Sequence, residues 1–399
     1  MTNALQQSRA NRNAPSFRSD PTKFTGRQSW DRTDTLFSIG MVALALQSTQ
    51  IGIAQPGQLW LLAALVYIAH SKKLVISRFE VVVFGLFFFY ACMLDVLTDF
   101  DRIKAAEQTF KFGFLYPGFY LVGRSFGRRY ARSAVPLGFL FLVVLLALEI
   151  ATQRLGIPLL YADVDFQKDV LHGTFKERNW LAVYFFLFSF FLFEKGSSEG
   201  RLQIQGVLLF VGINVLVMIA SGSKTTFVGC GIALLARARI PVPAKILLIA
   251  IGGLAYWSVF SDDFSEARIR VRLEEERGLA FQQAIELIGQ NLFGYGFGFV
   301  ESYFSNLGLT IRGLGSGVNS IFSVPLDLLI IAGPLGLLCW LVFFCGLGIG
   351  CTTVLAPVAA LSLLNPLHQS DLVYFFVGML VSQSRYRRRP QRISPALRE

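Results

Sequence analysis

Long hydrophobic runs alternate with short polar segments along most of this 399-residue chain. A membrane-spanning α-helix needs about 20 predominantly apolar residues, whereas a transmembrane β-strand shows a short alternating pattern. The runs here are continuous, so the pattern predicts an all-α polytopic membrane protein with about twelve transmembrane helices. The runs that we predict to be spans are 36–54, 59–70, 79–97, 109–122, 135–152, 180–193, 202–220, 225–236, 246–260, 321–332, 335–355 and 371–381.

One long hydrophilic insert, residues 261–319, separates the ninth run from the tenth. It contains the helix-like stretch LAFQQAIELIGQ, and in the helical stretch that begins two residues earlier at Arg277, steps of three and four residues put Arg277, Phe281, Ala284 and Ile288 on one face. We therefore expect a large loop that carries short amphipathic helices lying along the membrane surface.

The distribution of basic residues orients these elements. The net charge of +11 is concentrated at the two ends of the chain, which we predict to be a disordered tail over 1–35 and a tail over 384–399. The positive-inside rule assigns both tails to the cytoplasm, so they do not indicate nucleic-acid binding. The membrane domain then covers 36–383, and the loops at 153–179, 221–224 and 261–319 face outward, away from the cytoplasm.

The sequence offers little sign of a metal or cofactor. The five cysteines all lie in or beside hydrophobic runs, with neither metal-ligand nor disulfide spacing. The acidic pair Asp163 and Asp165 is a short pattern that is common by chance. The glycine-rich run at 294–298 lacks the following lysine and the strand–helix context of a phosphate loop. We expect no metal site and no cofactor.

Three outward-facing segments carry candidate cations. Lys224 stands among small residues in the turn SGSKTT at 221–226, where it either meets an anion or snorkels to the interface. Arg277 begins the amphipathic stretch, where it either holds a ligand or pairs with Glu274 or Glu276. Just before the sixth span, the segment 172–179 either binds a ligand or is a charged interface flank; its three possible cations are His172, Lys176 and Arg178.

Four motifs, in chain order, resemble those of the O-antigen ligase and Wzy-type polysaccharide polymerase superfamily of bacterial inner membranes. The first is Gly-Thr-Phe at 173–175 with Asn179, and the second is the Ser-Gly-Ser-Lys-Thr turn at 221–225. The third is the Arg277 helix followed by NLFGYG at 291–296. The fourth is GVNS at 317–320, followed by GPLG at 333–336. Together these motifs cover about residues 170–340.

This resemblance implies a glycosyltransferase that polymerises undecaprenyl-pyrophosphate-linked oligosaccharide units at the periplasmic face, without a nucleotide sugar. Arg277 and Lys224 would then hold the leaving pyrophosphate, because fixed cations stabilise the charge that develops there. Asn319 would orient a sugar. The remaining candidates for substrate binding are Arg178, Lys176, Arg312 and His172. A flippase and a chain-length regulator of the same pathway are the implied protein partners.

The general base and the exact reaction stay open. Four residues are candidate bases: His172, Asp163, Asp169 and Glu301. One alternative is an O-antigen ligase that transfers glycan to lipid A core, although Val318 stands where such ligases carry histidine. Another is a multi-pass transporter, because ionisable residues within spans often mark ion pathways. The residues of this kind here are Glu80, Asp95, Lys111, Glu149 and Asp371.

Overall fold

The structure is a computed structural model of the whole chain. It describes fourteen stretches and five single residues. The described stretches are 32–46, 55–71, 74–98, 101–130, 134–154, 178–198, 204–221, 225–236, 242–243, 246–247, 276–306, 323–346, 349–363 and 365–387, with 175, 223, 250, 254 and 321 between them. The two predicted tails and most of the ninth predicted span, 246–260, lie outside the described residues.

Helices are the regular structure of the described residues, which contain no strand. In the first half of the chain they are α1 (Arg32–Ala45), α2 (Pro56–Ser71), α3 (Arg78–Leu97), α4 (Arg102–Phe110), the π-helix η2 (Lys111–Leu115), α5 (Tyr116–Tyr130) and α6 (Ala134–Arg154). In the second half they are α7 (Arg178–Ser198), α8 (Ile204–Ser221), α9 (Thr225–Leu235), α12 (Glu276–Gln290), α13 (Phe299–Asn306), α14 (Val324–Gly346), α15 (Ile349–Leu361), the 3-10 helix η5 (Leu367–Gln369) and α16 (Asp371–Arg387). The predicted all-α class is thus confirmed for these residues.

Three of these helices are long and apolar enough to cross a membrane: Arg78–Leu97, Ala134–Thr152 and Val324–Gly346. They also leave apolar side chains exposed, as at Phe89 of α3, which is 72% exposed. Exposing such apolar surface to water is unfavourable, whereas the lipid chains of a membrane would cover it. Shorter apolar helices are Asp34–Ala45, Asn179–Glu194, Gln205–Ser221, Thr225–Leu235 and Asp371–Ser382.

The structure changes two details of the predicted spans. The residues between the predicted spans 79–97 and 109–122 include the helix α4, which begins at Arg102, because the Asp101 carboxylate accepts hydrogen bonds from the first free N–H groups of the helix. The runs 321–332 and 335–355 were expected to be separate spans, and α14 is indeed interrupted between them by non-helical geometry at Ala332 and Gly333. The second run is not one helix to residue 355, because α14 ends at Gly346 and α15 begins at Ile349.

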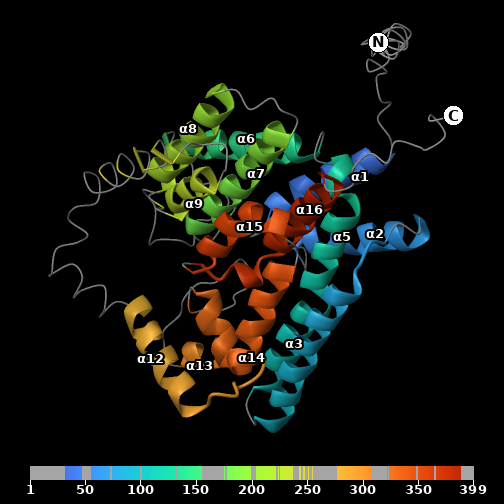
Figure 1. Cartoon of the computed structure of the whole chain (residues 1–399), viewed down its shortest axis with the longest axis vertical. Helices are drawn as coiled ribbons and strands as arrows, with labels where there is room; N and C mark the ends of the chain where they lie inside the picture. Colours follow the sequence, from blue (N-terminus) through green and yellow to red (C-terminus); the bar gives the residue numbers. More distant parts are fainter. Residues whose placement is uncertain are drawn as a thin grey trace, which may run out of the picture.

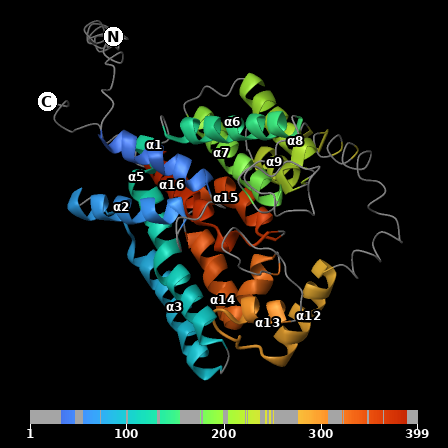
Figure 2. The ribbon, with the colours of Figure 1, turned by 180° about the vertical axis from the view of Figure 1, so that it is seen from behind.

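The helices form two groups with α15 and α16 between them. Figure 1 shows α6, α7, α8 and α9 on one side of this central pair and α3, α12, α13 and α14 on the other. The view from behind in Figure 2 agrees with this arrangement. Helix α16 packs along α5, and the two backbones approach closely at Gly123 and Gly378, where a Cβ atom would collide with backbone carbonyl groups of the opposite helix. Residues that are far apart in sequence therefore meet at the centre.

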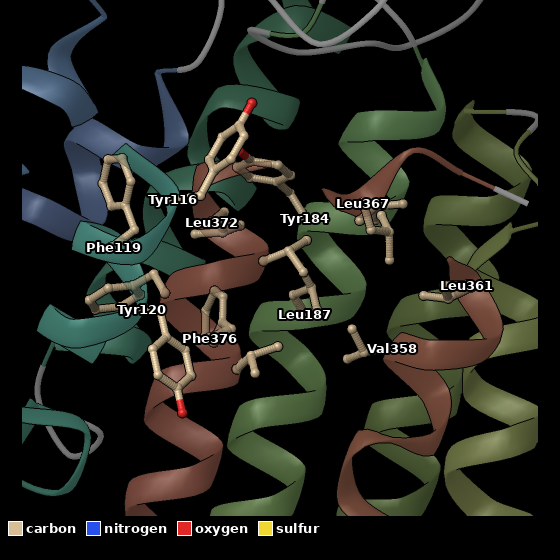
Figure 3. Close-up of a cluster of buried hydrophobic side chains, with 14 of the residues drawn as sticks. Tyr116, Phe119, Tyr120, Tyr184, Leu187, Val358, Leu361, Leu367, Leu372 and Phe376 are labelled. Atoms are coloured by element: carbon tan, nitrogen blue, oxygen red, sulfur yellow. The ribbon is translucent and has the colours of Figure 1, made fainter. Parts of the chain in front are cut away.

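Large apolar side chains fill the centre of the molecule. Tyr116, Phe119 and Tyr120 of α5 lie beside Leu372 and Phe376 of α16, and labelled side chains of α7 and α15 lie to the right of them in Figure 3. The ring of Tyr116 stacks on that of Tyr374, with centroids 4.9 Å apart. This apolar surround is the environment in which the buried polar groups described below must find partners.

Candidate functional site

The predicted cationic side chains lie outside the described residues. Arg277 is the second residue of α12 and Arg178 the first of α7, so the structure describes where their backbones stand but not their side chains. The other predicted site residues are outside the described residues altogether: Lys224, Lys176, Arg312, Asn319 and His172. The structure does describe the helices and turns that flank them.

The glycine-rich run after α12 closes onto the break in α14. Because α14 loses helical geometry at Ala332 and Gly333, carbonyl groups before the break need other donors. The N–H groups of Tyr295 and Gly296 donate to the carbonyl oxygens of Ile330 and Ile331, at 2.8 and 2.9 Å. The NLFGYG motif is therefore hydrogen-bonded to the residues that directly precede the GPLG motif, although the two motifs are separate in the sequence.

The same run is fastened to α3. The Tyr90 hydroxyl donates to the Phe293 carbonyl at 3.1 Å, and the Thr98 hydroxyl donates to the Tyr295 carbonyl at 2.7 Å. Gly296 has a φ of 89°, and a side chain there would strike Asp95. The N–H groups of Tyr295 and Gly296 are already hydrogen-bonded to α14. This run therefore attaches the insert to α3 and α14, and these two N–H groups are not available to bind a phosphate.

The turn between α8 and α9 holds buried hydroxyl groups on both sides of position 224. The Ser221 hydroxyl donates to the Val217 carbonyl and accepts from the Ser223 N–H. The hydroxyls of Ser223 and Thr226 are both buried and lack a hydrogen-bond partner in the part of the chain that the structure describes. They stand at the N-terminus of α9, where free N–H groups and the helix dipole favour an anion.

This turn and the start of α7 lie at one end of the α7–α8–α9 unit. The Asn214 amide of α8 donates to the Ser189 hydroxyl of α7 at 2.9 Å, which fixes the antiparallel register of these two helices. Gly229 of α9 faces the ring of Phe186. At the α7 start, Phe175 packs against Tyr184 with centroids 4.5 Å apart. The described residues of the first two resemblance motifs therefore lie at the same end of this unit.

A buried polar segment, 365–371, joins α15 to α16; we call it the polar junction. All of its residues are buried, although five of them have polar side chains: Asn365, His368, Gln369, Ser370 and Asp371. Tyr184 of α7 lies beside Ser370 and within electrostatic range of Asp371. On the opposite side, the Tyr116 hydroxyl donates to the Gln369 carbonyl at 3.2 Å. The polar junction therefore contacts both α7 and α5.

Within the junction, His368 faces Asp327 of α14. His368 Nε2 lies 3.4 Å from Asp327 Oδ2, and the Asp327 Oδ1 atom accepts from the Ile321 N–H at 3.3 Å. Burial lowers the pKa of His368 to about 3, so the imidazole is neutral and its contact with Asp327 is not an ion pair. His368 Nδ1 has no hydrogen-bond partner among the described residues.

Lys111, at the start of η2, holds the buried positive charge of this region. Its Nζ donates to Glu107 Oε1 at 2.7 Å, and the partly exposed Lys104 donates to Glu107 Oε2 at 3.2 Å. Burial raises the pKa of the Glu107 carboxyl, but the two lysines outweigh that effect and hold it below its ordinary value. Short π-helices often occur at functional sites, because the wider turn redirects a side chain.

Two further carboxyl groups approach Lys111 from other helices. Asp371 of α16 lies within its electrostatic range and accepts a hydrogen bond from the Gln58 side chain. Glu301 of α13 is 5% exposed and interacts electrostatically with Lys111, Glu107 and Asp327. Burial raises the pKa of Glu301 to about 8. We call Glu107, Lys111, Glu301 and Asp371 the lysine cluster.

The sequence interpretation named three members of the lysine cluster without associating them. Glu301 was one of four candidate bases, while Lys111 and Asp371 were noted only as scattered charges in the transporter alternative. The polar junction was missed entirely. A sequence signal for a buried polar segment was present. The seven residues NPLHQSD at 365–371 separate two hydrophobic runs. They are too few for an exposed loop of the size predicted at 261–319.

Comparison with known proteins adds no relative to this picture. No family model, no curated protein and no solved structure matches the chain. Among the described residues, no group of three His, Cys, Asp or Glu side chains has an arrangement that could hold a metal ion.

Proposed function

We propose that this protein is a membrane glycosyltransferase that polymerises undecaprenyl-pyrophosphate-linked oligosaccharide units at the periplasmic face of a bacterial inner membrane. The observation that supports this most is that described residues of the resemblance motifs lie together in two pairs. NLFGYG is hydrogen-bonded to the residues that precede GPLG, and the turn at 221–225 lies at the same helix end as the start of α7. Motifs that serve a common function are expected to be close in space, and each pair agrees with that expectation.

The turn at 221–226 suits the chemistry that the reaction needs. When an acceptor hydroxyl attacks the anomeric carbon of the growing chain, the lipid pyrophosphate leaves with additional negative charge. The α9 N-terminus and the buried hydroxyls of Ser223 and Thr226 can donate to such an anion. Lys224 would add a point charge and Arg277 a planar fork of donors. Supporting contacts would come from Arg178, Lys176, Arg312, Asn319 and His172.

The lysine cluster favours a second candidate, an ion-coupled transporter. Charged groups inside a membrane protein are costly, and clusters of carboxyl groups around a lysine occur along proton pathways. The structure gathers Lys111, Glu301 and Asp371, which a transporter could use to couple proton movement to transport. The ligase alternative gains no comparable support, because Val318, which stands in place of its histidine, lies outside the described residues.

Purified protein in vesicles should separate these candidates. Vesicles would receive synthetic undecaprenyl-pyrophosphate-linked repeat units, with lipid A core added in a parallel sample, and the products would be resolved by size. A ladder of polymer lengths supports the polymerase. Glycan attached only to lipid A core indicates the ligase, and unaltered units that accumulate across the bilayer indicate the transporter.

We call the proposed contact of Arg277 and Lys224 with the leaving pyrophosphate the pyrophosphate grip. It predicts how substitutions at these two residues change the rate. Arg277→Ala and Lys224→Ala should each reduce turnover roughly a hundred- to a thousandfold, since one preorganised donor contributes about 2.7–4 kcal/mol to transition-state stabilisation. Lys224→Arg should retain much of the activity, whereas Arg277→Lys should lose the two-pronged contact. Glu286→Gln, an exposed change on the same helix as Arg277, is the matched control. Full-length polymer at normal yield from Arg277→Ala would refute the grip.

A further inference from the structure

A cavity of about 730 Å³, which includes the open space at its mouth, lies between α3, α14 and α16. Helices α3 and α14 stand side by side in both views (Figure 1 and Figure 2). Mostly apolar pockets of about 300–1,000 Å³ with a few polar groups are typical sites for small ligands. None of the described residues of the turn at 221–226 lines this cavity, so it is separate from the proposed pyrophosphate site. Its walls are largely aromatic, with Phe84, Phe87, Phe112, Trp340, Phe343 and Tyr374 among the lining residues.

The cavity is elongated along α14 and reaches the outer surface of that helix. Its lining residues on α14 extend from Leu328 to Phe344, which is about 24 Å of helix at about 1.5 Å per residue. Near the second end, Trp340 and Phe344 are half-buried, and Leu341 between them is 46% exposed. Because α14 is long and apolar enough to span a membrane, this end borders a surface that lipid chains would cover. A hydrocarbon chain can therefore enter the cavity from the membrane.

The opposite end of the cavity, near Leu328, carries hydrogen-bonding groups. His368 of the polar junction lies in this wall and is 3% exposed, and neither of its ring nitrogens has a hydrogen-bond partner among the described residues. The Ser362 hydroxyl also lines the cavity; it donates to the Val358 carbonyl at 2.8 Å, which leaves its oxygen as an acceptor. A buried polar group without a partner is unfavourable, so this end calls for a hydrogen-bonding group from an occupant.

The charge at this end favours a neutral hydroxyl group. A neutral imidazole has one N–H donor and one acceptor nitrogen, and a hydroxyl group can bond to either of them. The described lining residues include no lysine, arginine or carboxylate side chain, and Asp327 Oδ2 lies 3.4 Å from His368 Nε2. An anionic headgroup would therefore meet no cation in the wall and a carboxylate beyond it, which makes its burial unfavourable.

We propose that this cavity binds a neutral long-chain alcohol, with the hydrocarbon chain among the aromatic side chains and the hydroxyl group hydrogen-bonded to His368. The chain matches the length and the apolar walls of the cavity, and the hydroxyl group supplies the partner that the imidazole lacks. Straight-chain and isoprenoid alcohols share this chemistry. The inference goes beyond the proposed polymerase, whose lipid-linked substrate carries a pyrophosphate, and it is tested without any glycan.

A photoreactive alcohol tests this assignment. Purified full-length protein in phosphatidylcholine vesicles would receive dodecanol that carries a diazirine in its chain, and mass spectrometry would locate the adducts after irradiation. We expect adducts on lining residues of α14 and α16, such as Cys339 and Val377. Excess unlabelled dodecanol should remove these adducts but not those on the exposed Phe89, because a binding site saturates whereas a lipid-facing surface does not.

Competitors that differ in one property identify the bound chemistry. Dodecane lacks the hydroxyl group and should be a roughly two- to tenfold weaker competitor, which is the effect of one hydrogen bond between neutral groups. Dodecanoate, which carries a charge, should be weaker still. Farnesol tests the isoprenoid source, and the stronger competitor of farnesol and dodecanol identifies the chain that the cavity accepts. Competition by undecaprenyl pyrophosphate where both alcohols fail would overturn the proposal and assign the cavity to the polymerase substrate.

Two variants locate the site. His368→Phe should remove the advantage of dodecanol over dodecane, and Cys339→Phe should place a ring in the cavity and abolish the saturable labelling. Leu338→Phe adds a ring at the neighbouring position, which is 54% exposed, and is the matched control that should label as wild type. Adducts on the lining residues that excess dodecanol does not reduce, or equal competition by dodecane and dodecanol, would contradict the proposal. Both outcomes are read on wild-type protein, so a variant that fails to fold does not affect them.

Discussion

Two of the places where the described residues bury charge differ in how that charge is compensated. At one end of α3, the Glu80 carboxylate pairs with Arg124 and accepts from the Tyr120 hydroxyl and the Ser77 N–H, both at 3.0 Å. The Ser77 side chain completes a capping box with Glu80. In the lysine cluster, three carboxyl groups approach one buried ammonium group, and the neighbouring amides of Gln108 and Gln369 have no partner among the described residues.

This difference separates a structural ion pair from a cluster that binds a proton. Every interaction described for Glu80 stabilises its ionised form, so we expect this carboxylate not to exchange protons. The ion pair with Arg124 joins α3 to α5. In the lysine cluster, burial raises the pKa of Glu301 to about 8, so this carboxyl group binds a proton near neutral pH. Burial alone therefore does not identify a functional residue; the balance of charge around it does.

The largest expected effect on stability comes from removing one partner of the Glu80–Arg124 ion pair. Arg124→Met should lower the free energy of unfolding by about 3–5 kcal/mol, because it leaves the Glu80 charge buried. Chemical unfolding in detergent measures this loss. Replacing both partners, with Glu80→Leu and Arg124→Met together, should recover most of it. An Arg124→Met protein as stable as wild type would show that the pair is not structural.

An intermediate effect is expected from undocking the insert. Gly296→Ala adds a side chain at a φ of 89° and against Asp95, which should cost about 1–3 kcal/mol. Because Glu301 has a raised pKa, its stabilising contribution is present below the unfolded pKa, near 4.5, and is lost as pH rises through about 8. The insert carries Glu301 to the cluster, so this variant should also lose that pH dependence of Tm. Gly212→Ala in α8, where nothing lies within 4 Å, is the matched control and should be neutral or stabilising. A pH dependence that survives Gly296→Ala would mean that docking does not bring Glu301 to the cluster.

The smallest effect is expected at Lys104. It shares Glu107 with Lys111, but its side chain is 42% exposed whereas that of Lys111 is 9% exposed. Lys104→Met should therefore change stability by under about 1 kcal/mol, since solvent screens exposed pairs. Thermal unfolding beside Lys111→Met gives the comparison. Equal losses in the two variants would show that the buried position of Lys111 is unimportant.

Local features of the fold were accessible from the sequence. The predicted run 79–97 corresponds to α3, 135–152 to α6 and 225–236 to α9, because uninterrupted apolar stretches of this length have few alternatives to helix. The spacing in LAFQQAIELIGQ likewise predicted α12, although its most buried residues are Ala280, Ala284 and Leu287, a face shifted from the one expected.

The lysine cluster was not accessible in the same way. Lys111 and Asp371 are 260 residues apart in the chain, and they meet because α5 and α16 approach closely at Gly123 and Gly378. Glu301 joins them only because the run at 293–296 docks on α3 and on the break in α14. These are tertiary contacts that no local pattern specifies. The cations that the motifs suggested, Arg277 and Lys224, remain predictions.

Infrared spectroscopy tests the contrast between the two charge centres most directly, since a protonated carboxyl group absorbs separately from a carboxylate. We predict that purified wild-type protein at neutral pH shows a protonated-carboxyl band, that part of this band is lost as pH rises through about 8, and that Glu301→Gln lacks this part. Glu80→Gln, if it folds, should keep the band. A band that is unchanged in Glu301→Gln, or that is lost only in Glu80→Gln, would contradict the assignment of the lysine cluster as the proton-binding centre.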